Sequence, residues 1–277
     1  MVFETDKEVL DWYEKQPRAL SQEFIDEIPW EDVPRYPLNP KFVPVLVYMR
    51  DIEIFTEVYH NELKRTPTGK DPVISKFMER WGVEEITHGE VLNQFLEIAG
   101  YPQGDRWMEK AKKTIPFSYT ANTYITTMLT NLVGKSFTGA HMTWGAINEM
   151  TAQQSYRRLW MLAEHPVLEK ILRAIVREES AHAQFYWSIA RLELNRSEFT
   201  QKLARFIIRK FWSPVGQGTK PEKDANLMIT TLFDGEEGVN WVDKHITQRL
   251  KQLPSFEDVD TVTKRIATVA LPETAIA

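Results

Sequence analysis

Two segments of the chain place a glutamate three residues before a histidine. The first, WGVEEITHGEV, contains Glu85 and His88, and the second, VREESAHAQFY, contains Glu179 and His182. Residues three apart on a helix lie about 60° apart around the axis and about 4.5 Å apart along it. A carboxylate and an imidazole at this spacing can therefore bind one metal ion.

The same spacing also occurs at Glu57 and His60, so spacing alone does not identify a metal site. The neighbours of the other two pairs are more informative, because each pair interrupts an otherwise apolar helical stripe. The two stripes consist of Phe77, Trp81, Leu92 and Phe95, and of Leu172, Ile175, Tyr186 and Ile189. A buried carboxylate costs roughly several kcal/mol unless it is paired or bound to a cation. Two such stripes require a shared cation or a polar network, and their match favours a metal.

Each Glu-x-x-His helix needs an antiparallel partner helix that contributes a further inward carboxylate, as in ferritin-like bundles. Glu149 is the candidate for the second pair, because it and Glu179 each lie about fourteen residues from the EHP turn. For the first pair the same reasoning selects Glu53. Glu57 would lie one helical turn, roughly 6 Å, too close to the loop. We therefore predict that His60 has a structural or supporting role.

The chain is predicted to be all-α, because no long segment alternates at period two. Long helices are expected from about residue 42, over 72–98, over 138–163 and from 166 to about 195. Short helices are expected before residue 28, near 105–113, over 197–212 and twice within 223–253. The segment TANTYITTMLTNLVGKSF is rich in β-branched residues but is assigned to a helix because of its length and its lack of proline.

We expect a single domain, with an N-terminal arm (1–40), a bundle core (41–195), and C-terminal helices with a tail (196–277). The proline-rich stretch PWEDVPRYPLNPKFVP is expected to be an extended arm without regular structure. The last twenty or so residues are expected to form a weak tail.

The composition excludes several classes of protein. There are no cysteines, which excludes disulfides and thiolate metal sites, and the formal net charge of −5 argues against a nucleic-acid binder. The acidic, polar N-terminus is not typical of a signal peptide, and no apolar run has the length of a membrane span. A cytoplasmic protein is the expectation, and any metal is held by histidine and carboxylate, which suits Fe, Mn or Zn.

Three stretches resemble the soluble acyl-acyl-carrier-protein desaturases, the type 2 fatty acid desaturases. They are ERWGVEEITHGEVLNQFLEIAG, VLVYMRDIE and EESAHAQFYWSIARL. The likeness covers about residues 40–195, and the C-terminal FWSPVG resembles the bacterial, actinobacterial branch. The resemblance implies a ferritin-like four-helix di-iron bundle core with additional helices. The metal ligands that it implies are Glu53, Glu85, His88, Glu149, Glu179 and His182.

The resemblance also implies an O2-dependent enzyme of fatty acid biosynthesis. It would place a double bond in an acyl chain on acyl carrier protein, with electrons from a ferredoxin and two Fe ions as cofactor. Mn at one site is compatible with the same ligands. Trp81 and Glu178 would orient ligands or pass electrons and protons. A homodimer is expected, and basic residues are candidates for binding the carrier: Lys64, Arg65, Lys110, Lys112 and Lys113.

Plant members of that family have a threonine near the O2 site at the position of Ala152, whose neighbour here is Thr151. This departure leaves two alternatives beside desaturation. One is a di-iron oxygenase, such as a hydroxylase or an N-oxygenase, and the other is a non-catalytic iron-binding bundle.

Overall fold

The computed structural model describes residues 2–271, and these residues fold almost entirely into helices. In this part of the chain the only β pairing is an isolated bridge between Gln217 and Lys220. The prediction of an all-α, ferritin-like bundle with additional helices is therefore confirmed. None of the described helices is both long and apolar enough to cross a membrane.

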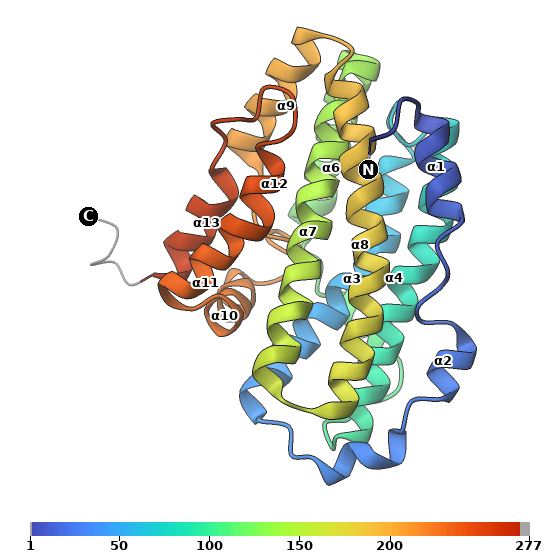
Figure 1. The fold of residues 1–277 in the computed structure, drawn as a ribbon, viewed down its shortest axis with the longest axis vertical. Helices are drawn as coiled ribbons and strands as arrows, with labels where there is room; N and C mark the ends of the chain where they lie inside the picture. Colours follow the sequence, from blue (N-terminus) through green and yellow to red (C-terminus); the bar gives the residue numbers. More distant parts are fainter. Residues whose placement is uncertain (1, 272–277) are drawn as a thin grey trace.

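Four long helices form the core of the molecule (Figure 1). They are α3 (Val43–Leu63), α4 (Pro72–Ile98), α7 (Thr138–Ala163) and α8 (Pro166–Leu194). The helices α3 and α4 pack as one antiparallel pair, and α7 and α8 pack as the other. The two pairs meet in a buried aromatic contact, where the rings of Phe77 and Phe185 stack with centroids 3.7 Å apart.

The start of α4 follows from local sequence signals. The Asp71 side chain accepts hydrogen bonds from the N–H groups of Val73 and Ile74, and Pro72 occupies the first helical position. This arrangement satisfies helix N–H groups that have no intrahelical acceptor. Only two residues, Glu164 and His165, separate α7 from α8, so these two helices must be antiparallel.

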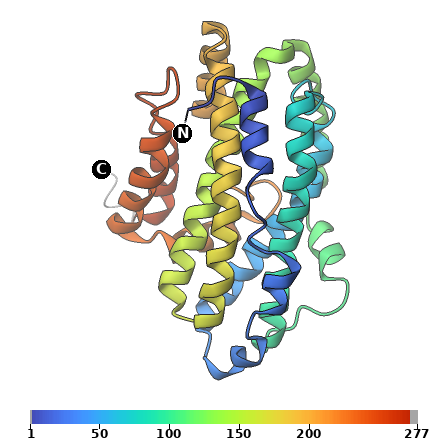
Figure 2. The ribbon, with the colours of Figure 1, turned by 45° about the vertical axis from the view of Figure 1, so that its right-hand side comes forward.

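The remaining helices cover the bundle. The helix α1 (Asp6–Glu14) packs on α4 and α8, as Figure 2 shows. The C-terminal helices lie on the side that carries α7 (Figure 1). The other elements are α2 (Gln22–Asp26), α5 (Trp107–Lys112), α6 (Phe117–Val133), η3 (Gly134–Phe137), α9 (Glu198–Phe211), α10 (Glu222–Leu232), α11 (Gly235–Val242), η4 (Asp243–Thr247), α12 (Gln248–Leu250) and α13 (Thr261–Ala270).

Two expectations about irregular segments are wrong. The proline-rich stretch contains two 3-10 helices, η1 (Trp30–Arg35) and η2 (Pro40–Phe42), because short turns need few backbone donors and tolerate proline. The end of the chain contains α13, whose Val262, Ile266 and Ala270 recur every fourth residue and are buried. Residues 272–277 of the expected tail lie outside the described residues.

A close approach between α7 and α8 depends on Gly145. A Cβ atom at this position would lie 2.3 Å from two ring carbons of Tyr186, which is buried beside the centre of the bundle. Gly82, on α4, is different, because an added Cβ would meet only His60 Nδ1 at 3.6 Å.

We predict that Gly145→Ala lowers the free energy of unfolding by roughly 1–3 kcal/mol, because the methyl group displaces the Tyr186 ring. The matched change Gly82→Ala should be neutral or should stabilise the fold by up to about 1 kcal/mol, since alanine is the better helix former. Denaturant unfolding of both variants measures the difference. Equal stability of the two variants would show that Tyr186 does not need the space above Gly145.

Candidate metal centre

All six residues expected to be ligands meet at the centre of the bundle. Each of the four long helices contributes at least one, and all six residues are at most 6 % exposed. They are Glu53 from α3, Glu85 and His88 from α4, Glu149 from α7, and Glu179 and His182 from α8.

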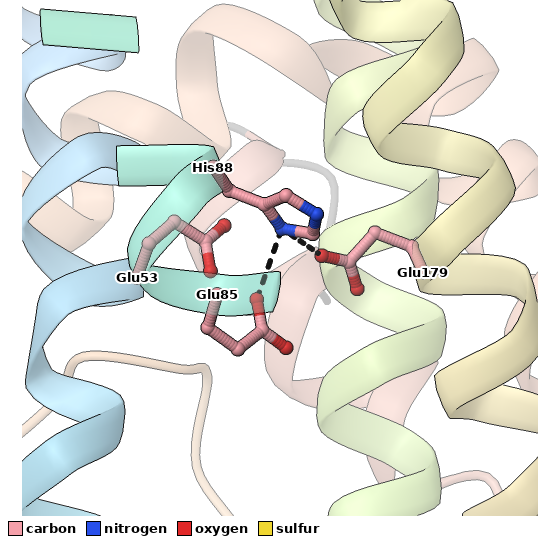
Figure 3. Close-up of side chains that lie close together, drawn as sticks. All are labelled: Glu53, Glu85, His88 and Glu179. Atoms are coloured by element: carbon pink, nitrogen blue, oxygen red, sulfur yellow. Dashed lines mark ion pairs between the residues drawn. The ribbon is translucent and has the colours of Figure 1, made fainter. Parts of the chain in front are cut away.

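These residues form two overlapping groups. In each group the candidate ligand atoms lie within 4.8 Å of one another. Both groups contain Glu85 and Glu179, the first adding Glu53 and His88, the second Glu149 and His182. Figure 3 shows the first group, in which side chains from α3, α4 and α8 point towards a common space. The two groups would hold one metal ion each and would share Glu85 and Glu179.

The contacts inside the cluster are close, but several of them lack the geometry of hydrogen bonds. His88 Nδ1 lies 3.0 Å from Glu85 Oε2 and 3.2 Å from Glu179 Oε1. His182 Nδ1 lies 3.2 Å from Glu85 Oε1. Within residues 2–271, both Nδ1 atoms and both Glu179 oxygens are buried without a hydrogen-bond partner. Buried polar atoms usually have partners, so lone pairs that converge without one fit metal ligation.

The other nitrogen of each imidazole is held by a carboxylate of the opposite Glu-x-x-His helix. His88 Nε2 lies 2.9 Å from Glu178 Oε2, and His182 Nε2 lies 2.8 Å from Glu84 Oε2. In a metal-loaded centre each Nε2–H would donate to its carboxylate, which leaves the Nδ1 lone pair for the metal. We call Glu84 and Glu178 the outer carboxylates. Each binds an imidazole of the opposite helix, so together they form a cross-brace between α4 and α8.

The cross-brace contains one residue that the sequence analysis expected and one that it missed. Glu178 had been assigned an orienting role, and Glu84 had not. Yet Glu84 precedes Glu85 in the chain as Glu178 precedes Glu179, so the repeated Glu-Glu-x-x-His pattern was a usable signal. Tyr156 was also missed; its hydroxyl hydrogen-bonds to Glu53 Oε1.

The other expected residues lie near the centre in different ways. Trp81 stacks on Phe77 with ring centroids 6.1 Å apart, and its buried Nε1 has no hydrogen-bond partner among the described residues. The Thr151 hydroxyl donates to the Ile147 carbonyl of its own helix, so it is not directed at the cluster. Ala152 lines a cavity beside the cluster.

The third Glu-x-x-His pair lies outside the cluster. Glu57 is exposed and forms an ion pair with Lys112. His60 is half-buried next to Gly82, and its Nε2 has no hydrogen-bond partner in the described part of the chain. The structure thus places Glu53 in the cluster and Glu57 at the surface, one helical turn away.

A large cavity reaches the cluster from one side. Its volume is about 830 Å³, and its wall includes Glu53, Glu85, Glu149 and Glu179. Apolar residues supply much of the remaining wall, among them Met78 from α4, Trp144 from α7, and Leu203, Phe206 and Ile207 from α9. Volumes of this order are typical of sites that hold a small molecule or a cofactor.

The metal-free cluster retains protons that a cation would displace. Burial, together with the negative charge of Glu85, raises the pKa values of Glu53, Glu149 and Glu179. Burial opposes the charged form of Glu85 as well, but the neighbouring His182 lowers its pKa. Burial also disfavours charge on His88, yet its hydrogen bond to Glu178 and the nearby carboxylates of Glu179 and Glu85 raise its pKa.

The outer carboxylates remain ionised. Burial alone would raise the pKa of Glu178, but hydrogen bonding to His88 and to backbone N–H groups, with the charge of Arg18, lowers it to about 2. Burial likewise opposes ionisation of Glu84, whose pKa is lowered by His182, Tyr13 and Arg80.

These pKa shifts predict that the metal-free fold loses stability as the pH rises. Carboxylates with lowered pKa give their full stabilisation above the unfolded glutamate value of about 4.3, so they add no further change there. The groups with raised pKa bind more protons in the folded state, and their stabilisation is lost as the pH rises through their folded pKa values. Above about pH 5 the second effect dominates.

Thermal unfolding of the metal-free chain at a series of pH values measures this effect. We expect the melting temperature to fall from weakly acidic to weakly basic pH. Added divalent metal should reverse the fall, because metal ions replace the protons. A melting temperature that rises over this range in the absence of metal would contradict the proposed charge balance.

Glu53→Ala and Glu57→Ala form a matched test of the ligand set, since both change one carboxylate on α3. We predict that Glu53→Ala reduces the iron bound per chain from about two to about one, since it removes one ligand of one site. Glu57→Ala should still bind about two, because its side chain faces solvent. Iron analysis after anaerobic reconstitution gives both numbers. Equal iron content in the two variants would show that Glu53 is not a metal ligand.

Comparison with known proteins agrees with this geometry. None of the curated proteins matches the chain. The sequence model of the family described as fatty acid desaturase matches residues 54–217, more than half of the chain. The matched region contains five of the six clustered residues and begins one residue after Glu53. The chain therefore belongs to the fatty acid desaturase family.

Proposed function

We propose that the chain is an O2-dependent di-iron desaturase that acts on a fatty acyl chain carried by acyl carrier protein. The observation that carries the proposal is the pair of overlapping Glu/His groups at the wall of a large, mostly apolar cavity. Four carboxylates neutralise two divalent ions, and six ligands for two ions leave positions free for O2. Family membership supports the same reaction.

The reaction balances with the partners that the proposal names. A –CH2–CH2– unit of the acyl chain, O2, two electrons and two protons give –CH=CH– and two molecules of water. Bound iron would supply the reduction of O2. The protein positions the chain along the apolar wall, excludes bulk water, and holds the imidazoles through Glu84 and Glu178.

The arrangement of charges supports an acidic carrier as partner. Lys64, Lys110 and Lys113 are exposed, whereas Lys112 is engaged by Glu57 and Arg65 lies over the Tyr124 ring. An exposed basic group raises the rate and selectivity of encounter with an acidic protein. The ferredoxin donor belongs to the same proposal, and so does the homodimer. Large apolar side chains on α6 support the latter because they are more than half exposed: Phe117, Tyr124, Ile125, Met128, Leu129 and Leu132.

One feature of the cavity favours the oxygenase as a second candidate. The helix α6 contributes polar residues to the cavity wall: Tyr119, Asn122, Thr123, Thr126, Thr127 and Thr130. Such a wall can hydrogen-bond a polar substrate group or a hydroxylated product, and Ala152 provides no hydroxyl near the cluster.

Product analysis separates these functions. We predict that the iron-loaded chain, given reduced ferredoxin, 18O2 and a saturated acyl chain on acyl carrier protein, forms a product lighter by two hydrogens and free of 18O. Mass spectrometry of the released acyl chain measures both changes. The same chain on coenzyme A should react more slowly, because it lacks the acidic protein.

Each other outcome assigns a different function. Incorporation of 18O without a double bond would replace desaturation by oxygenation. Oxidation of the ferrous centre by O2, with no change in any acyl substrate and no effect of substrate on the rate, would indicate a non-catalytic iron-binding bundle. Equal rates with acyl carrier protein and with coenzyme A would show that the enzyme does not recognise the carrier protein.

A further inference from the structure

A segment with no expected ligands completes the hydrogen-bonding around the metal centre. We call residues 13–20 the N-terminal clasp; they connect the end of α1 to the start of α2 and lie outside the matched family region. The N–H groups of Ala19 and Leu20 donate to Glu178 Oε1 at 2.7 and 3.1 Å. Arg18 Nε donates to the same oxygen at 3.1 Å. The other oxygen of Glu178 holds His88.

The same clasp contacts the other outer carboxylate. The Tyr13 hydroxyl donates to Glu84 Oε2 at 2.5 Å, beside the contact of that oxygen with His182. Arg80 donates to Glu84 Oε1 at 2.8 Å, and its remaining donors bind the carbonyls of Tyr13, Glu14 and Gln16. The clasp is therefore fixed to α4 by one arginine and to both outer carboxylates by its own donors.

Arg18 is the residue of the clasp that reaches both sides. Its Nε lies 3.1 Å from Glu178 Oε1 and 3.2 Å from Glu84 Oε1. The Arg18 side chain is 31 % exposed, whereas the two carboxylates are at most 2 % exposed. One guanidinium thus holds two buried anions, each of which orients an imidazole in a different half of the centre.

We propose that Arg18 is a positioning residue for both halves of the metal centre, acting through Glu84 and Glu178 on His182 and His88. The inference rests on the proposed function only in requiring that the cluster bind two metal ions. Outer hydrogen bonds that fix imidazole orientation typically change metal affinity by about 10–100-fold. Because Arg18 contacts both outer carboxylates, its removal should weaken the binding of both metal ions. Removal of a residue that contacts only one outer carboxylate would weaken the binding of one ion.

The simplest alternative is a purely structural arginine that neutralises two buried carboxylates. It predicts a less stable fold but an unchanged affinity and geometry of the metals. The two accounts differ in the spectrum of the bound metal, because the d–d bands of Co(II) report ligand geometry and are insensitive to the stability of the fold.

The experiment is anaerobic titration of the full-length, metal-free chain with Co(II), followed by the visible d–d spectrum. Arg18→Met removes the guanidinium and keeps an apolar stem of similar length. Arg35→Met is the matched control, since Arg35 also lies in the N-terminal region but is 70 % exposed and, among the described residues, pairs only with Asp32.

We expect Arg18→Met to bind both Co(II) ions about 10–100-fold more weakly, with altered d–d bands, while Arg35→Met matches the unchanged chain. Methylguanidinium should restore part of the Arg18→Met affinity by occupying the vacated position, and it should not affect the control. Arg18→Lys keeps the charge but places a methylene group where the arginine has Nε, the atom that contacts both carboxylates. It should therefore weaken the binding of both ions, by less than Arg18→Met does.

The proposal is overturned if Arg18→Met binds both ions with unchanged affinity and spectrum. If Arg18→Met does not fold, Arg18→Lys decides, and an unchanged affinity and spectrum in that variant overturns the proposal equally. The test is independent of catalysis. A chain that binds two Co(II) ions but forms no double bond after iron loading refutes the proposed function and leaves the role of Arg18 intact.

Discussion

The structure is organised around four mutually repelling carboxylates buried at the centre of a helical bundle. Glu53, Glu85, Glu149 and Glu179 come from four different helices and are all nearly inaccessible to water. Without a cation, burial and mutual repulsion raise the pKa values of Glu53, Glu149 and Glu179, so these side chains retain protons. Two divalent ions would resolve this conflict, so the site that weakens the metal-free fold is also the site proposed to carry the chemistry.

The surroundings of the carboxylates serve that central constraint. Glu84 and Glu178 each hold an imidazole on the opposite helix, so α4 and α8 are tied together at the level of the cluster. The N-terminal clasp donates two N–H groups to Glu178, and its Arg18 lies within ion-pair distance of both outer carboxylates. The other side of the cluster opens to the cavity, so the hydrogen bonds that hold the imidazoles and the proposed route for the substrate lie on different sides of the centre.

The sequence predicted those features that repeat along one helix or between two helices joined by a short turn. The Glu-x-x-His spacing and the distances to the turns were sufficient to place Glu53 rather than Glu57 beside Glu85. The sequence did not reveal Arg18 or Tyr13, because their contacts join distant residues and depend on an irregular segment without periodicity. Tyr13 and Glu84 are 71 positions apart, and Arg18 and Glu178 are 160 positions apart. Tyr156 was missed for a similar reason, since a tyrosine on a buried helix face usually reads as core. The sequence did not predict the 3-10 turns and α13, because the burial of Val33, Phe42 and Val262 depends on packing against other helices.

Anomalous scattering at the iron edge from crystals of the iron-loaded chain tests the central claim most directly. The account predicts two iron peaks roughly 3.5–4 Å apart, as in other two-metal sites, with Glu85 and Glu179 contacting both. His88 Nδ1 should lie on one ion and His182 Nδ1 on the other. A single peak, or iron bound away from Glu85 and Glu179, would contradict the account.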